Sequence, residues 1–145
     1  PLAQALEGNN IKHDIALPVS AIPAFVAATD AALQRALPGA RLVDFGHLGD
    51  GNLHYNVQAP EGVAADDFLR DHEHTANRIV YDAVQAHGGS ISAEHGIGAL
   101  KVEELRERKS AVALSLMRAI KQALDPQGIL NPGRVLDAQP GRPTP

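Results

Sequence analysis

The sequence has 145 residues, 44% of them hydrophobic and 21% charged, which is ordinary for one globular domain with its own core. The formal net charge of -4 and the absence of a basic stripe argue against a nucleic-acid partner. No cysteine is present, which excludes disulfides and thiolate zinc sites, so redox chemistry would require a cofactor. No apolar stretch approaches the ~18 residues of a membrane span.

The first part of the chain alternates between strand and helix patterns. A two-residue period over residues 11–19 predicts a strand, with Ile11, His13, Ile15, Leu17 and Val19 on one side. His13 is expected to be a structural residue of that strand. Ser20 is then placed to cap a helix over residues 21–36. Two further strands are predicted at residues 41–47 and 53–58, joined by a glycine-rich tight turn.

Helical patterns dominate the rest of the sequence. Residues 66–87 have the pattern of an amphipathic helix, which a Gly-Gly pair ends. Residues 90–93 are predicted to form a short extended segment. Helices are predicted at residues 99–108 and 110–124. The second of these is expected to bury Leu114, Met117, Ile120 and Leu124.

The order strand, helix, strand, strand, helix, short strand is that of a ferredoxin-like split βαβ unit. We therefore predict an α+β fold, with helices on one face of an antiparallel sheet and further helices at the C-terminal end. This domain covers residues 1–136, and the tail at residues 137–145 is predicted to be disordered. No strand followed by GxGxxG and a helix occurs, so no Rossmann nucleotide site is expected.

Two histidines and a glutamate suggest a metal site. His47 and His54 flank the glycine-rich turn, and cross-strand neighbours lie about 5 Å apart, so both rings can reach one ion. Glu94 lies in a second glycine-bounded loop and is the candidate carboxylate. Such a set suits zinc, manganese or iron(II) and leaves positions open for water or substrate. The alternative is that the two histidines only stabilise the turn.

Three further residues are candidates for contact with a substrate. His95 follows Glu94, and adjacent side chains in an extended segment point apart, so His95 is a candidate general base; imidazole exchanges protons near neutral pH. It could equally bond a loop carbonyl. Asn56 projects from the same strand face as His54. Lys12 is either a solvated charge or an anchor for a carboxylate.

Three ordered motifs resemble the C-terminal domain of FAD-linked oxidases. They are GHLGDGNLH at residues 46–54, EHGIG at residues 94–98 with Lys101, and DPQGILNPGR at residues 125–134. This group contains D-lactate dehydrogenases, the glycolate oxidase flavin subunit and D-2-hydroxyglutarate dehydrogenase, within the vanillyl-alcohol oxidase superfamily. The resemblance covers about residues 11–135, nearly the whole chain.

The resemblance implies a metal centre and a catalytic base. In metal-dependent members, the residues that match His47, His54 and Glu94 bind a divalent ion, usually zinc. The residue that matches His95 is the catalytic base.

The resemblance also implies substrate and cofactor contacts. The lysine that matches Lys12 holds a substrate carboxylate, and the residue that matches Asn56 lies in the substrate pocket. Asn131 and Arg134 match a stretch packed near the flavin, where the family more often has lysine in place of Arg134.

The resemblance further implies that the parent protein oxidises the 2-hydroxyl of a small D-2-hydroxy acid and transfers a hydride to FAD. D-lactate, glycolate and D-2-hydroxyglutarate are the candidate substrates, and a protein or quinone would accept the electrons. We expect a cytoplasmic location, with attachment to the inner membrane as the alternative.

The family's FAD domain precedes the matching region and is absent from this sequence. We therefore expect a fragment that is inactive alone, binds no FAD and self-associates through uncovered apolar surface. Two other functions stay open from the residues. One is a stand-alone metal-binding or regulatory module without a redox role. The other is a metal-dependent hydrolase that uses His95 and a zinc-bound water.

Overall fold

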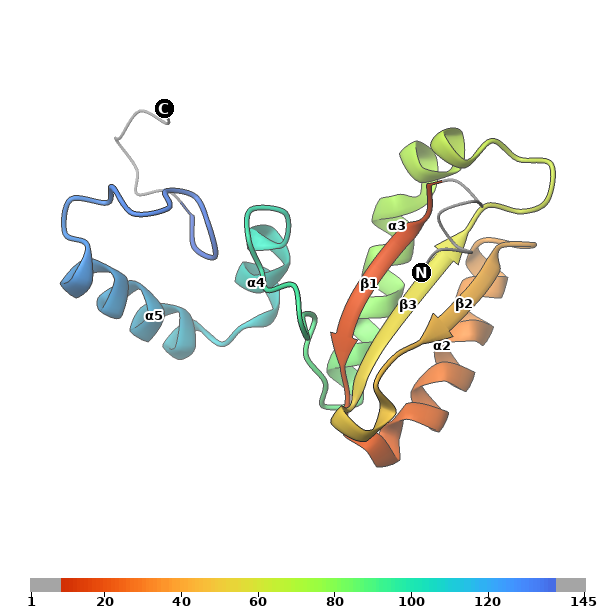
Figure 1. The fold of residues 1–145 in the computed structure, drawn as a ribbon, viewed down its shortest axis with the longest axis horizontal. Helices are drawn as coiled ribbons and strands as arrows, with labels where there is room; N and C mark the ends of the chain where they lie inside the picture. Colours follow the sequence, from red (N-terminus) through yellow and green to blue (C-terminus); the bar gives the residue numbers. More distant parts are fainter. Residues whose placement is uncertain (1–8, 138–145) are drawn as a thin grey trace. The chain divides into compact units, whose positions relative to one another are not determined.

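The computed structural model describes residues 9–137 and divides the chain into two compact units, Pro1–Glu94 and His95–Pro145, each described by itself (Figure 1). The elements of the first unit are β1 (Ile11–Ala16), η1 (Val19–Ala21), α2 (Ile22–Ala36), β2 (Arg41–Phe45), η2 (Leu48–Asp50), β3 (Asn52–Gln58) and α3 (Ala65–Ala86). Those of the second are α4 (Val102–Arg108) and α5 (Ala111–Leu124). Within residues 9–137, no helix is long and apolar enough to cross a bilayer. All but the first residue of the predicted disordered tail lies outside the described residues.

The sheet has the order β1-β3-β2, and both outer strands run antiparallel to β3. β1 and β2 are therefore parallel to each other, with β3 between them and α2 in the connection, which is the split βαβ arrangement. Ser90 forms an isolated bridge with Ala16 at the end of β1, where the short fourth strand was expected. Both helices of this unit lie on one face of the sheet (Figure 1). The predicted α+β fold class is confirmed.

The core lies between the sheet and these two helices. Alternate residues of β3, among them Leu53 and Tyr55, are buried on the helix side. The ring of Phe25 in α2 meets that of Tyr55 edge-on, with centroids 5.8 Å apart. The Tyr55 hydroxyl donates to Asp30 at 2.5 Å. Burial, and then this hydrogen bond, raise the pKa of Tyr55 far above its usual value.

His13 is a structural residue of this core, as its place in the strand pattern predicts. It is buried, its Nδ1 lies 2.8 Å from the Tyr55 carbonyl oxygen, and its Nε2 lies 2.9 Å from Asn77 Oδ1. The ring therefore links β1 to β3 and α3.

The end of the first strand and the start of α2 differ from the prediction. β1 stops at Ala16 rather than Val19, because Pro18 has no N–H for a ladder and the chain turns into η1. Ser20 lies inside that turn and is not the helix cap. The cap position of α2 is Ala21, which makes no side-chain hydrogen bond.

The second unit buries less apolar surface than predicted. Leu114 is buried, but the exposed fractions of Ile120 and Leu124 are 61% and 77%. Met117 is half-buried. The seven-residue α4 and the loops of this unit are too small to cover a whole apolar stripe of α5. α4 also begins at Val102, three residues later than expected.

Candidate metal centre

The face of the sheet opposite the helices carries polar side chains. Because His13 and Tyr55 point toward the helices, the alternating residues point the other way. The strand register pairs Lys12 with Asn56 and Asp14 with His54. This register therefore gathers an ammonium, a carboxylate, an amide and an imidazole on one face.

The turn that carries His47 depends on close backbone approaches. Gly51 has a φ of 71°, and a Cβ there would collide with the carbonyl oxygen of Leu17. A Cβ at Gly46 would collide with the carbonyl oxygen of Asn52. The N–H of Leu17 donates to the Gly51 carbonyl at 2.9 Å, which ties the turn to the end of β1. Glycine at these two positions thus lets the turn lie against the sheet.

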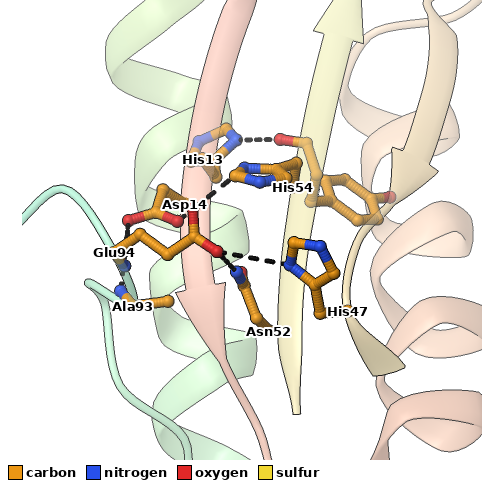
Figure 2. Close-up of polar contacts among 8 residues, drawn as sticks. His13, Asp14, His47, Asn52, His54, Ala93 and Glu94 are labelled. Atoms are coloured by element: carbon orange, nitrogen blue, oxygen red, sulfur yellow. Dashed lines mark hydrogen bonds and ion pairs between the residues drawn. The ribbon is translucent and has the colours of Figure 1, made fainter. Parts of the chain in front are cut away.

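Glu94 contacts both the turn and β3. Its Oε1 lies 3.4 Å from His47 Nδ1 and accepts a hydrogen bond from Asn52 Nδ2 (Figure 2). The side chains of His47 and Glu94 are 73% and 49% exposed, so a small ligand can reach them. The structure therefore brings together two of the three predicted metal ligands.

His54 contacts a different carboxylate. Its Nδ1 lies 3.7 Å from Asp14 Oδ1. Figure 2 marks this contact with a dashed line. One carboxylate oxygen each of Asp14 and Glu94 and one ring nitrogen of His95 all lie within 4.8 Å of one another, a set that could also hold a cation. The two histidine–carboxylate pairs are therefore neighbours. Ligation of one ion by His47, His54 and Glu94 together stays a prediction.

The residues fit a divalent cation. Imidazole nitrogens and carboxylate oxygens are donors that zinc accepts readily. In addition, Asn52 Oδ1 is buried and has no hydrogen-bond partner among the described residues. A buried carbonyl oxygen without a partner beside Glu94 is suited to a cation or to a water bound to one.

Sequence reasoning missed two residues of this cluster, Asp14 and Asn52. Asp14 shares a face of the strand Ile11–Ala16 with Lys12, a candidate substrate contact, and this shared face was a usable signal for Asp14. Asn52 was assigned to the turn, but it begins β3 and is buried.

The remaining candidates lie at three places. Lys12 is exposed and Asn56 is buried in the central strand. His95 is exposed and is the first residue of the second unit. Asn131 and Arg134 lie in the loop after α5, where Asn131 has a positive φ of 45°.

Asp125 organises that loop. Its carboxylate accepts the N–H groups of Ile129 and Leu130, both at 3.0 Å, and the Lys121 ammonium at 2.7 Å. The hydrogen bond from Lys121, with the backbone donors, lowers the pKa of Asp125 to about 2. The loop that carries Asn131 is thereby anchored to the end of α5.

Comparison with known proteins identifies the family. A family model described as FAD linked oxidases, C-terminal domain, matches residues 1–135. The chain belongs to this family. The resemblance inferred from the three sequence motifs is therefore confirmed.

Several curated relatives of this FAD-linked oxidase domain are D-2-hydroxyglutarate dehydrogenases. That of Xanthomonas citri pv. viticola is 44% identical over 126 residues, which are 87% of this chain and 26% of the relative. That of Stutzerimonas stutzeri is 41% identical over 127 residues, 88% of this chain and 27% of the relative. The mitochondrial enzyme of Arabidopsis thaliana is 42% identical over 137 residues, 93% of this chain and 23% of the relative. The chain thus spans about a quarter of the length of these relatives.

Proposed function

We propose that the chain is the substrate- and metal-binding portion of a flavin-dependent D-2-hydroxy acid dehydrogenase. The observation that carries this proposal is the cluster of Glu94 with His47 and Asn52, beside His54 on the polar face of the sheet. Family membership supports the flavin, and the names of the relatives favour D-2-hydroxyglutarate among the candidate substrates.

His47, His54 and Glu94 would hold the divalent ion, with zinc as the first choice. Such an ion, when bound, lowers the pKa of a hydroxyl that it coordinates. The exposed side chains of His47 and Glu94 leave room for a substrate to approach the same place.

The chain's other residues would bind the substrate and move its proton. Lys12 would orient the substrate carboxylate through its positive charge. Asn56 lies directly across the ladder from Lys12, so its amide can hydrogen-bond the same substrate. His95 would accept the proton of the 2-hydroxyl.

FAD, when bound, is the hydride acceptor in this scheme. Asn131 and Arg134 would contribute to its surroundings, while most of its binding site would belong to sequence outside this chain. An electron-acceptor protein or a quinone would then reoxidise it. The cytoplasmic location stays a prediction, and the Arabidopsis relative is named mitochondrial.

A substrate screen of the full-length protein that contains this chain tests the proposal. With FAD and zinc present and a dye as electron acceptor, we expect oxidation of D-2-hydroxyglutarate and little oxidation of its L-enantiomer. Lys12→Met should lower kcat/KM by about 10–100-fold, mainly through KM, because a charge-assisted hydrogen bond is worth roughly 1.5–3 kcal/mol. A loaded protein that oxidises no 2-hydroxy acid would rule out the proposed function.

A further inference from the structure

We propose that Asp14 is a positioning residue of this centre, which fixes the backbone of Glu94 and sets the proton position on His54. The inference rests on the proposed metal role of those two residues. Asp14 itself is assigned no contact with metal or substrate.

The first contact is with the loop that carries Glu94. Asp14 Oδ2 accepts the N–H of Ala93 at 3.2 Å and the N–H of Glu94 at 2.9 Å. The Ala93 N–H also lies 3.3 Å from the Asp14 carbonyl oxygen. Glu94 is 80 residues further along the chain, and its side chain reaches past Asp14 toward His47 and Asn52 (Figure 2). The Asp14 carboxylate therefore holds the backbone from which Glu94 extends.

The second contact is with His54. Asp14 Oδ1 lies 3.7 Å from His54 Nδ1, an ion-pair distance rather than a hydrogen-bond distance. A carboxylate beside Nδ1 favours the tautomer with its proton on that nitrogen. The lone pair is then on Nε2, which becomes the donor for a cation, as in carboxylate–histidine–metal arrangements.

The burial of Asp14 supports a role in positioning other residues, in addition to any contribution to the stability of the fold. Its side chain is 4% exposed, and it lies between the buried His13 and Ile15 of β1. Burial of a carboxylate is costly, and an apolar residue at such a position often stabilises a fold as well or better. Among the groups that face this carboxylate are His54 and the Glu94 N–H, which belong to the two residues that need positioning.

Two variants of the full 145-residue chain separate the two contacts, and amide exchange and the His54 tautomer are measured without metal. Asp14→Ala removes both contacts. Asp14→Asn keeps an oxygen that can accept the two N–H groups, but it presents an NH₂ donor to His54 Nδ1. The matched control is Asp44→Asn, which makes the same charge change at an exposed position of β2. Amide hydrogen exchange reports the loop, and the ¹⁵N chemical shifts of His54 report its tautomer.

For Asp14→Ala we expect the exchange rates of the Ala93 and Glu94 amides to rise by about 10-fold or more, because they lose a charged acceptor. For Asp14→Asn we expect a smaller rise and a shift of the His54 proton from Nδ1 to Nε2. Zinc affinity, measured by competition with a chromophoric chelator, should fall by about 10–100-fold in both variants. The control should change none of the three readouts.

Unchanged exchange in Asp14→Ala together with an unchanged His54 tautomer in Asp14→Asn would overturn the inference. So would a loss of zinc affinity with both metal-free readouts unchanged, because Asp14 would then be a ligand itself. The exchange and tautomer measurements need neither metal nor substrate. Their failure is therefore distinguishable from a failure of the proposed function, which would appear as absent turnover.

Discussion

Replacing His54 with alanine is expected to remove bound zinc and turnover together, whereas His95→Ala should leave zinc bound and lower kcat by about 10²–10⁴-fold. His54 lies in the central strand beside Asp14 and is proposed as a ligand. His95 follows Glu94 in a bend, and one of its ring nitrogens lies within 4.8 Å of carboxylate oxygens of Asp14 and Glu94. The family resemblance assigns the two histidines different roles, one as ligand and the other as base, and the two variants test that assignment.

The comparison requires the full-length protein, with metal content and dye reduction measured on the same preparations. His74→Ala is a suitable control, since His74 is an exposed residue of α3. It should change neither quantity. If His95→Ala lost as much zinc as His54→Ala, His95 would be a ligand and the assignment of the base would be wrong.

A single methyl group at Gly51 is expected to lower the stability of the first unit and to disturb the proposed metal site. The backbone there has a φ of 71°, and an alanine Cβ would collide with the Leu17 carbonyl oxygen. The unfavourable backbone conformation alone costs roughly 1–3 kcal/mol, and relief of the collision would displace the turn that carries His47. We expect Gly51→Ala to lower the free energy of unfolding by at least that amount and to weaken zinc binding.

The neighbouring glycine provides a matched control for this substitution. Gly49 lies in the same turn, and a Cβ built there meets nothing within 4 Å. Gly49→Ala should therefore change the free energy of unfolding by no more than about 0.5 kcal/mol. Chemical denaturation of the three proteins measures the difference. Equal stabilities for the two variants would mean that the close approach of Gly51 to Leu17 does not constrain the turn.

The helices and strands of the first unit could be predicted because the spacing of apolar residues along the sequence indicates each of them. Leu53 and Tyr55 alternate with His54 and Asn56, and such alternation decides which side of a strand faces the helices. The limits of β1 were less predictable. Its apolar alternation continues to Val19, but the missing N–H of Pro18 ends the ladder before that.

The site could be predicted only in part, because its contacts join distant positions. Spacing around the turn pointed to His47 and His54, but spacing alone could not separate ligands from turn residues. The pairing of Asp14 with the N–H of Glu94 spans 80 residues, and no periodicity encodes it. The three sequence motifs were sufficient to predict the family. The neighbours of His54 became known only from the strand register of the structure.

The most direct test of the metal centre is the zinc K-edge X-ray absorption spectrum of the zinc-loaded 145-residue chain and its His47→Ala variant. We expect two imidazole nitrogens and at least one carboxylate oxygen at ~2.0–2.2 Å in the unmodified chain. The variant should lose the scattering of one imidazole ring. A spectrum with oxygen ligands alone, or one that His47→Ala leaves unchanged, would contradict the assignment of this cluster as the metal site.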